Sequence, residues 1–134
     1  MVAKTKSISL ENAEALLSFL PVFEDPDFYV GEVVVEKGVM PYWEYDRQVH
    51  LFIKTLYENG WVIDFGWPDW QKQAKRYWKY PDMIKRARMS TIQKLLTTHV
   101  RKDRFCEGNL AIAIKNGYIV WILRRLDKLA KSFS

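Results

Sequence analysis

The chain has 134 residues, close to the commonest size of a folded domain, and we expect residues 1–134 to form one globular domain. Apolar residues make up 49% and charged residues 28%, which is an ordinary balance for a globular protein. The single cysteine, Cys106, excludes an internal disulfide and favours a reducing compartment. Because Met1–Ser7 leads into no apolar run and no stretch approaches the ~20 apolar residues of a membrane span, we expect a cytoplasmic protein without a membrane partner.

Charge is distributed unevenly along the chain, whose formal net charge is +5. Residues 1–78 hold 8 Lys/Arg against 12 Asp/Glu and carry −4, whereas residues 79–134 hold 13 Lys/Arg against 4 Asp/Glu and carry +9. This asymmetry suggests an anionic partner for the basic half. The alternative, which we favour, is that the acidic half folds back onto the basic half or that the charges cover solvated helix faces.

The first third of the chain predicts a helix followed by a hairpin. Apolar side chains recur at helical spacing over residues 9–20, Ser9 is a suitable N-cap, and we expect Pro21 to end this helix. Residues 28–42 contain two glycines and a run of three valines, which indicates a small β-hairpin that turns at Lys37-Gly38. Because a two-stranded ribbon is marginally stable alone, it must lean on the helices.

Helical patterns dominate the remainder. A second helix is predicted from Asp46 to the stop signal Asn59-Gly60, and a third from Pro68, interrupted at Pro81, with a short turn through Met89. Ser90 and Gln93 fit a capping box for a fourth. A short helix around residues 110–116 and an amphipathic one over 119–131 complete a mainly α fold: a single-domain bundle of about five or six helices with a small β-hairpin near residues 28–42.

The densest polar segment runs from Thr97 to Gly108. On a continuous helix His99, Asp103 and Cys106 would share one face, with Glu107 beside them, as zinc ligands or as a thiolate nucleophile with its base. We favour a structural role, because a buried His bonded to an Asp one turn away is common and a lone Cys is often buried. We therefore predict no metal and no cofactor, with a catalytic cluster of these four residues as the alternative.

Basic residues offer two candidate anion sites. Arg101 and Arg104, near Lys94, Thr97 and Lys102, are suited to hold a phosphate or carboxylate, or to pair internally with Glu24, Asp25 and Asp27. The second site lies between Trp70 and Met89, where cations alternate with Trp70, Tyr77, Trp78 and Tyr80 in a manner suited to single-stranded nucleic acid. If those aromatic residues are buried, the positive charge is the only feature of this site that a nucleic acid could contact. The cations of this second site are Lys72, Lys75, Arg76, Lys79, Lys85, Arg86 and Arg88.

The segment 95–101, with the run Asp103-Arg104-Phe105-Cys106-Glu107-Gly108, resembles the core of an uncharacterised family of small prokaryotic and phage-borne proteins. The looser stretches 40–42, 56–60 and 122–126 are similar to it as well, so the resemblance covers nearly the whole chain. A family of unknown function implies no activity and no catalytic residues for this chain.

No Gly-rich phosphate loop, G-x-S-x-G elbow or C-x-x-C motif is present in the sequence. Our leading hypothesis is a non-catalytic binding module whose basic C-terminal half contacts nucleic acid or an acidic protein surface. The alternative is a small enzyme, such as a hydrolase, built around His99, Asp103, Cys106 and Glu107.

Overall fold

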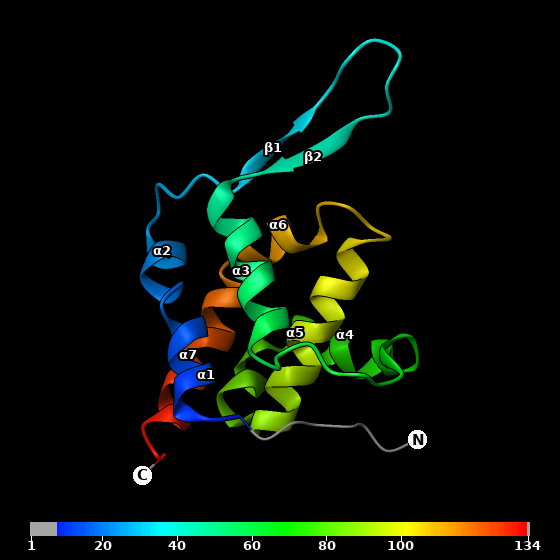
Figure 1. Cartoon of the computed structure of the whole chain (residues 1–134). Coiled ribbons are helices and arrows are strands. Elements are labelled where there is room, and N and C mark those ends of the chain that lie inside the picture. The colour runs from blue at the N-terminus through cyan, green and yellow to red at the C-terminus, as the bar shows by residue number, and fades with distance from the viewer. Residues whose placement is uncertain (1–7, 134) are drawn as a thin grey trace.

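The computed structural model describes residues 8–133, and helices dominate it, as predicted (Figure 1). A two-stranded antiparallel hairpin is added to the helices. None of the helices between residues 8 and 133 combines the length and the apolar composition that a membrane-spanning helix needs. The elements in chain order are α1 (Leu10–Leu17), α2 (Leu20–Glu24), β1 (Gly31–Val34), β2 (Tyr42–Tyr45), α3 (Arg47–Glu58), the 3₁₀ helix η1 (Trp67–Trp70), α4 (Gln71–Lys79), the 3₁₀ helix η2 (Pro81–Arg86), α5 (Met89–Asp103), α6 (Asn109–Lys115) and α7 (Tyr118–Ala130).

The first predicted helix is divided into two. α1 begins after Ser9, whose side chain accepts a hydrogen bond from the Asn12 backbone N–H, while the Asn12 side chain accepts one from the Ser9 backbone N–H. Pro21 does not end this helix but lies in the first turn of α2, where its missing N–H leaves no helical bond unmade. Residues 8–133 therefore hold seven α-helices where the sequence predicted five or six.

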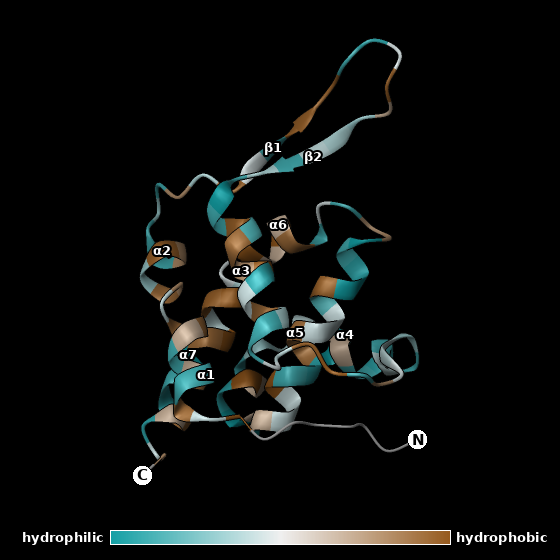
Figure 2. Ribbon diagram, viewed as in Figure 1, coloured by the Kyte–Doolittle hydropathy of each residue, from teal (hydrophilic) through white to brown (hydrophobic). Residues whose placement is uncertain are grey.

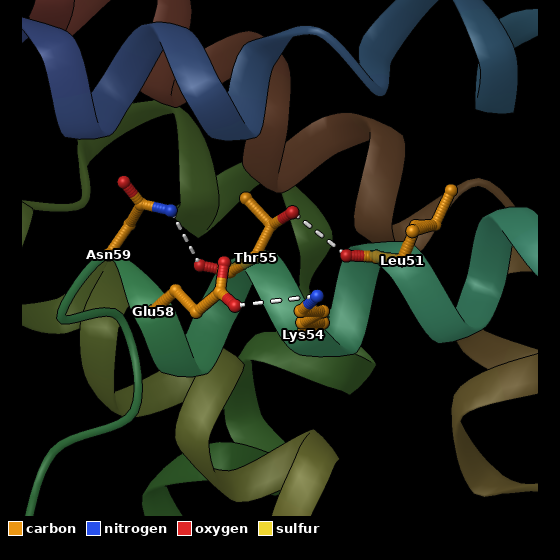
Figure 3. Close-up of polar contacts among 5 residues, drawn as sticks. All are labelled: Leu51, Lys54, Thr55, Glu58 and Asn59. Carbon is orange, nitrogen blue, oxygen red and sulfur yellow. Dashed lines mark hydrogen bonds and ion pairs between the residues drawn. The ribbon is translucent and has the colours of Figure 1, made fainter.

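The boundaries of α3 agree with the prediction. The Asp46 side chain accepts a hydrogen bond from the Gln48 backbone N–H and caps the N-terminus. At the other end, the Asn59 side-chain amide donates to the Thr55 carbonyl oxygen over 3.0 Å, and Lys54 pairs with Glu58 over 3.7 Å (Figure 3). Gly60 then takes a positive φ of 76°, as a residue that leaves a helix often does.

One expectation about the middle of the chain is confirmed and another is corrected. The predicted third helix is interrupted at Pro81 as expected: η1 leads into α4, which ends at Lys79, and the short helix η2 begins at Pro81. The capping box at Ser90 and Gln93 is wrong, because α5 already begins at Met89 with Arg88 as its N-cap. The Gln93 side chain instead donates to the Gly60 carbonyl oxygen, 33 residues away, and is buried.

The core forms around α7, which packs against α1, α2, α5, α6 and η2. Its apolar stripe, which includes Ile119, Ile122 and Leu126, is fully buried, and apolar residues line the inner sides of the helices (Figure 2). Trp61 is also fully buried, where α5 holds the segment after α3: Thr97 Oγ1 donates to the Trp61 carbonyl oxygen over 3.2 Å. One core cluster thus includes buried residues of every α-helix except α4, which packs against it through the partly buried Tyr77.

The hairpin projects from the helical body as an arm (Figure 1). Its register pairs Gly31 with Tyr45 and Val34 with Tyr42, so the strands lie slightly later than the predicted range of 28–42. The turn includes Lys37 and Gly38 as expected, and Gly38 has a φ of +83°.

Candidate functional site

The polar segment 97–108 does not continue as one helix. α5 ends at Asp103, and residues 104–108 form a turn closed by a hydrogen bond from the Cys106 N–H to the Lys102 carbonyl oxygen. Gly108 leaves this turn with a φ of +95°, and a Cβ atom there would collide with the indole of Trp43. The helical register that would align Cys106 with His99 is therefore interrupted.

His99 lies in an aromatic environment and has no contact with Asp103 among the described interactions. Its ring lies 4.9 Å from the Tyr118 ring and 5.8 Å from the Trp78 indole, measured between centroids. The side-chain amide of Asn109 approaches His99 Nδ1 at 3.4 Å. Burial, and to a smaller extent the charge of Lys102, lower the pKa of His99 to about 4, so the ring is neutral at pH 7.

Asp103 binds elements far away in sequence. Its Oδ1 atom accepts a hydrogen bond from the Tyr45 hydroxyl over 2.7 Å and another from the Leu110 backbone N–H over 3.0 Å. Burial and the Asp103 carboxylate raise the pKa of Tyr45, which keeps its phenol protonated as the donor. Asp103 thus fastens β2 to the start of α6, which is a structural use of the carboxylate.

Glu107 and Cys106 have different surroundings. The Glu107 carboxylate accepts a hydrogen bond from the Trp43 backbone N–H and so binds the hairpin, whereas Cys106 is exposed. The structure therefore does not bring His99, Asp103, Cys106 and Glu107 together. Over residues 8–133, no group of three or more His, Cys, Asp or Glu side chains is arranged to hold a metal ion.

A basic cleft lies between η2 and α7, which we call the η2–α7 cleft. It has a volume of about 550 Å³, and Trp121 contributes an aromatic side chain that is 40% exposed. Arg125 is held in place because its Nε donates to the Ala87 carbonyl oxygen over 2.9 Å. The residues lining this cleft are Pro81, Asp82, Ile84, Lys85, Trp121, Arg124, Arg125 and Lys128.

A second cleft, the His99 cleft, lies where α4, α5 and α6 meet and has a volume of about 420 Å³. His99 is 8% exposed and is part of its wall, so the ring is buried but not entirely sealed. Cys106 does not line it. The lining residues are Gln71, Ala74, Lys75, Trp78, Thr98, His99, Lys102, Asn109 and Ile112.

The predicted cations divide between these surfaces. Lys85 lines the η2–α7 cleft and pairs with Asp82 over 3.4 Å, and Lys75 lines the His99 cleft. The others of the second predicted site are exposed on α4, on η2 or just after it: Lys72, Arg76, Lys79, Arg86 and Arg88. Trp78 and Tyr80 are exposed among them, while Trp70 and Tyr77 are partly buried and stack on each other.

Arg101 and Arg104 line neither cleft. Arg101 is partly buried with its guanidinium 5.8 Å from the centre of the Tyr57 ring, and Arg104 is exposed in the turn after α5. Thr97 is fully buried and binds the Trp61 segment, so it is not available to an anion. Glu24 pairs with Arg124 over 2.8 Å, which realises the internal pairing that the charge asymmetry suggested, though with a different arginine.

Sequence reasoning did not select Arg124, Arg125 and Lys128 as an anion site, although their position on the polar face of the last helix was recognisable. The sequence did not show which element packs against this helix. The packing of η2 against α7 puts Lys85 beside these three side chains, and periodicity along one helix carries no information on which element packs against it.

The comparisons with known proteins identify the chain at the level of a family only. No curated protein and no solved structure matches it. A family of unknown function (DUF6508) matches residues 8–132, and since this range is nearly the whole chain, the protein belongs to that family.

Proposed function

We propose that this protein is a non-catalytic binding module that holds single-stranded nucleic acid on its basic C-terminal half. The observation that carries this proposal is the η2–α7 cleft, in which four cationic side chains surround an exposed tryptophan. A positively charged groove and an accessible aromatic face are the two features that single-strand binding without sequence preference requires.

The charge of the cleft is suited to a polyanion. Lys85, Arg124, Arg125 and Lys128 face a single lining carboxylate, that of Asp82. Arg124 is partly neutralised by Glu24, but Lys128 has no ion pair with any residue between 8 and 133. Phosphates that replace the counterions of these side chains would supply most of the affinity.

Two features favour binding without much reorganisation. The hydrogen bond from Arg125 to the Ala87 carbonyl oxygen fixes the guanidinium, so less side-chain entropy is lost when a phosphate binds. Trp121 follows the buried Tyr118 by one helical turn, so its backbone is rigid while part of its indole remains accessible to a base. Pro81, at the start of η2, adds apolar surface beside it.

Further cations extend the surface beyond the cleft. Arg86 is exposed on η2 and Arg88 follows it, while α4, which packs against η2, presents Arg76 and Lys79. The contribution expected from these side chains is longer-range attraction, which raises the association rate more than the affinity.

The alternative hypotheses gain less support. A small hydrolase would need His99, Asp103, Cys106 and Glu107 in mutual contact. Instead His99, Asp103 and Glu107 contact different partners, and Cys106 is exposed. An acidic protein partner would use the same cations but would give Trp121 no specific role. We further propose a cytoplasmic location and a prokaryotic or phage origin, both of which rest on the sequence.

The experiment is fluorescence anisotropy with labelled single-stranded DNA and RNA oligonucleotides at low salt. We expect the double variant Lys85→Ala/Lys128→Ala to weaken binding by about tenfold, as the loss of two phosphate contacts implies. The matched control is Lys37→Ala/Lys54→Ala, which removes the same net charge from the hairpin turn and from α3, and it should change affinity by less than about twofold. A flat titration of the unmodified protein contradicts nucleic-acid binding, and equal losses in both variants contradict the assignment to this cleft.

A further inference from the structure

We propose that the His99 cleft is a second and separate binding site, for a small ligand that joins a flat heteroaromatic ring to an anionic group, as a nucleoside monophosphate does. It is lined by different residues from the η2–α7 cleft, so the proposal goes beyond the proposed function and does not depend on it.

The dimensions of the cleft are those of a small-molecule site. Its volume of about 420 Å³ lies within the range of roughly 300–1,000 Å³ that such sites occupy. Three helices, α4, α5 and α6, supply its walls. α5 and α6 contribute buried residues to the core, and α4 packs against the core through Tyr77. A site on rigid elements holds its groups in place before the ligand arrives.

The charge of the His99 cleft favours an anionic ligand. Lys75 comes from α4 and Lys102 from α5, and the cleft's described lining includes no Asp or Glu. Neither lysine forms an ion pair with another residue in the range 8–133. Two uncompensated ammonium groups at one cavity create a positive potential that a phosphate or carboxylate would neutralise.

The apolar surface of the His99 cleft favours a ligand with a flat ring. Trp78 is 39% exposed and is held by its contact with the buried Tyr118, at 4.7 Å between centroids. Ile112, from α6, is 54% exposed and adds aliphatic surface to the same cleft. An indole fixed in this way offers a stacking face at little entropic cost, which is how aromatic residues bind nucleobases.

Its polar groups are neutral and suited to the edge of a heteroaromatic ring. The Asn109 side-chain amide lies 3.4 Å from His99 Nδ1, and the neutral imidazole has one nitrogen that can donate a hydrogen bond and one that can accept one. Lys75 and Lys102 line the same cleft as His99, and the Tyr118 phenol ring lies 4.9 Å from the imidazole between centroids. Burial first, and then the charge of Lys102, lower the pKa of His99 and keep the ring uncharged. The cleft thus presents hydrogen-bonding groups on His99 and Asn109 together with cations on Lys75 and Lys102.

The test is isothermal titration calorimetry of the full chain with AMP and UMP, and with adenosine and inorganic phosphate as half-ligands. We expect one nucleotide bound per chain and weaker binding of both half-ligands. Absence of binding by either nucleotide at millimolar concentration overturns the proposal. If phosphate alone binds as tightly as AMP, the nucleobase adds nothing to the affinity, and the proposed stacking of the base on Trp78 is wrong.

Three variants locate the site. Lys75→Ala and Lys102→Ala should each weaken AMP binding by about fivefold, whereas Lys72→Ala, an exposed lysine one turn before Lys75 on α4 that does not line the cleft, should leave it unchanged. Ile112→Glu introduces a carboxylate at an exposed position of the cleft and should abolish binding in a folded protein. Full affinity in Ile112→Glu, or an equal loss in Lys72→Ala, contradicts this location.

A nuclear magnetic resonance titration of the His99 ring gives a second readout. A phosphate bound between Lys75 and Lys102 offsets the positive charge of Lys102, so the pKa of His99 should rise from about 4 when AMP is present. An unchanged pKa under saturating AMP places the nucleotide elsewhere. Because the η2–α7 cleft contains neither His99 nor these lysines, oligonucleotide binding there and AMP binding here can fail independently.

Discussion

His99 illustrates how the surroundings of a side chain, rather than its neighbours in sequence, decide its chemistry. Asp103 lies one helical turn away but is bound by Tyr45 and Leu110, while His99 packs against Trp78, Tyr118 and Asn109. The spacing predicted the helix correctly. It could not predict these partners, because they come from α4, α6 and α7 and from the hairpin.

The depressed pKa of His99 makes folding stability depend on pH. Above the unfolded-state pKa of 6.5 the ring is neutral in both states, and as the pH falls towards 4 only the unfolded chain binds the proton. The free energy of unfolding should therefore decrease between about pH 6.5 and pH 4 by up to about 3 kcal/mol from this residue. Urea unfolding of the natural chain and of His99→Gln at pH 7 and pH 4.5 isolates the effect. A pH dependence of equal size in the two proteins contradicts it.

Removing the hydroxyl group of Tyr118 and of Tyr45 should change the free energy of unfolding in opposite directions. Tyr118 is buried, and its hydroxyl has no hydrogen-bond partner among residues 8–133, so Tyr118→Phe should raise the free energy of unfolding by about 1 kcal/mol. The Tyr45 hydroxyl donates to Asp103 and accepts from the Gly108 N–H, so Tyr45→Phe should lower it by about 1–3 kcal/mol. Denaturant unfolding at pH 7 measures both, and a loss of stability in Tyr118→Phe would mean that its hydroxyl has a partner.

At the scale of secondary-structure elements, capping signals succeeded where the cap is local and failed where tertiary contacts set the boundary. Ser9 and Asp46 cap α1 and α3 as predicted. Ser90 fits the same pattern, but the buried Gln93 is held by the Gly60 carbonyl oxygen, and α5 starts one residue before Ser90. A sequence motif alone does not distinguish these cases, because the competing hydrogen bond comes from another part of the chain.

This difference between caps can be measured. Asp46→Ala should lower the free energy of unfolding by about 1 kcal/mol, because the Gln48 N–H loses its acceptor. Ser90→Ala, within the first turn of α5, should change it by less than about 0.5 kcal/mol. Thermal or urea unfolding of the two variants compares them directly. An equal loss in both would mean that Ser90 acts as a cap in solution.

The hairpin shows what an element needs beyond its own pattern. Its valines and glycines predicted two strands and a turn, but a two-stranded ribbon is marginal without support. The support lies at its base, where Glu107 accepts from the Trp43 N–H and Lys115 lies 5.6 Å from the centre of the Trp43 ring. The polar segment 97–108, for which the sequence favoured a structural role over a catalytic cluster, thus helps to attach the hairpin to α5 and α6.

Across the whole molecule, the acidic and basic halves of the chain are only partly matched to each other. Glu24 and Arg124 join them, 100 residues apart, through hydrogen bonds of 2.8 and 3.2 Å. Asp25 and Asp27 lie in the loop after α2. Most cations of α4 and η2 remain exposed, and within residues 8–133 they have no carboxylate partner. The composition predicted the asymmetry, but only the packing of η2 on α7 shows where positive charge is concentrated.

This arrangement predicts a specific response to salt. If phosphates displace counterions from the η2–α7 cleft, the logarithm of the affinity for single strands should fall with the logarithm of the salt concentration, by about 0.7 per phosphate neutralised. With up to four cations engaged, the slope of the natural chain should lie near −2 to −3, and Lys85→Ala/Lys128→Ala should make it shallower by about 1.4. Lys37→Ala/Lys54→Ala lowers the net charge equally but should leave the slope unchanged, because screening by salt limits exposed charges outside the cleft to a small effect. Anisotropy titrations at several salt concentrations measure the three slopes. If the slope becomes shallower by the same amount in both double variants, the strand responds only to the net positive charge of the protein. If it changes only in Lys85→Ala/Lys128→Ala, the phosphates bind in the η2–α7 cleft.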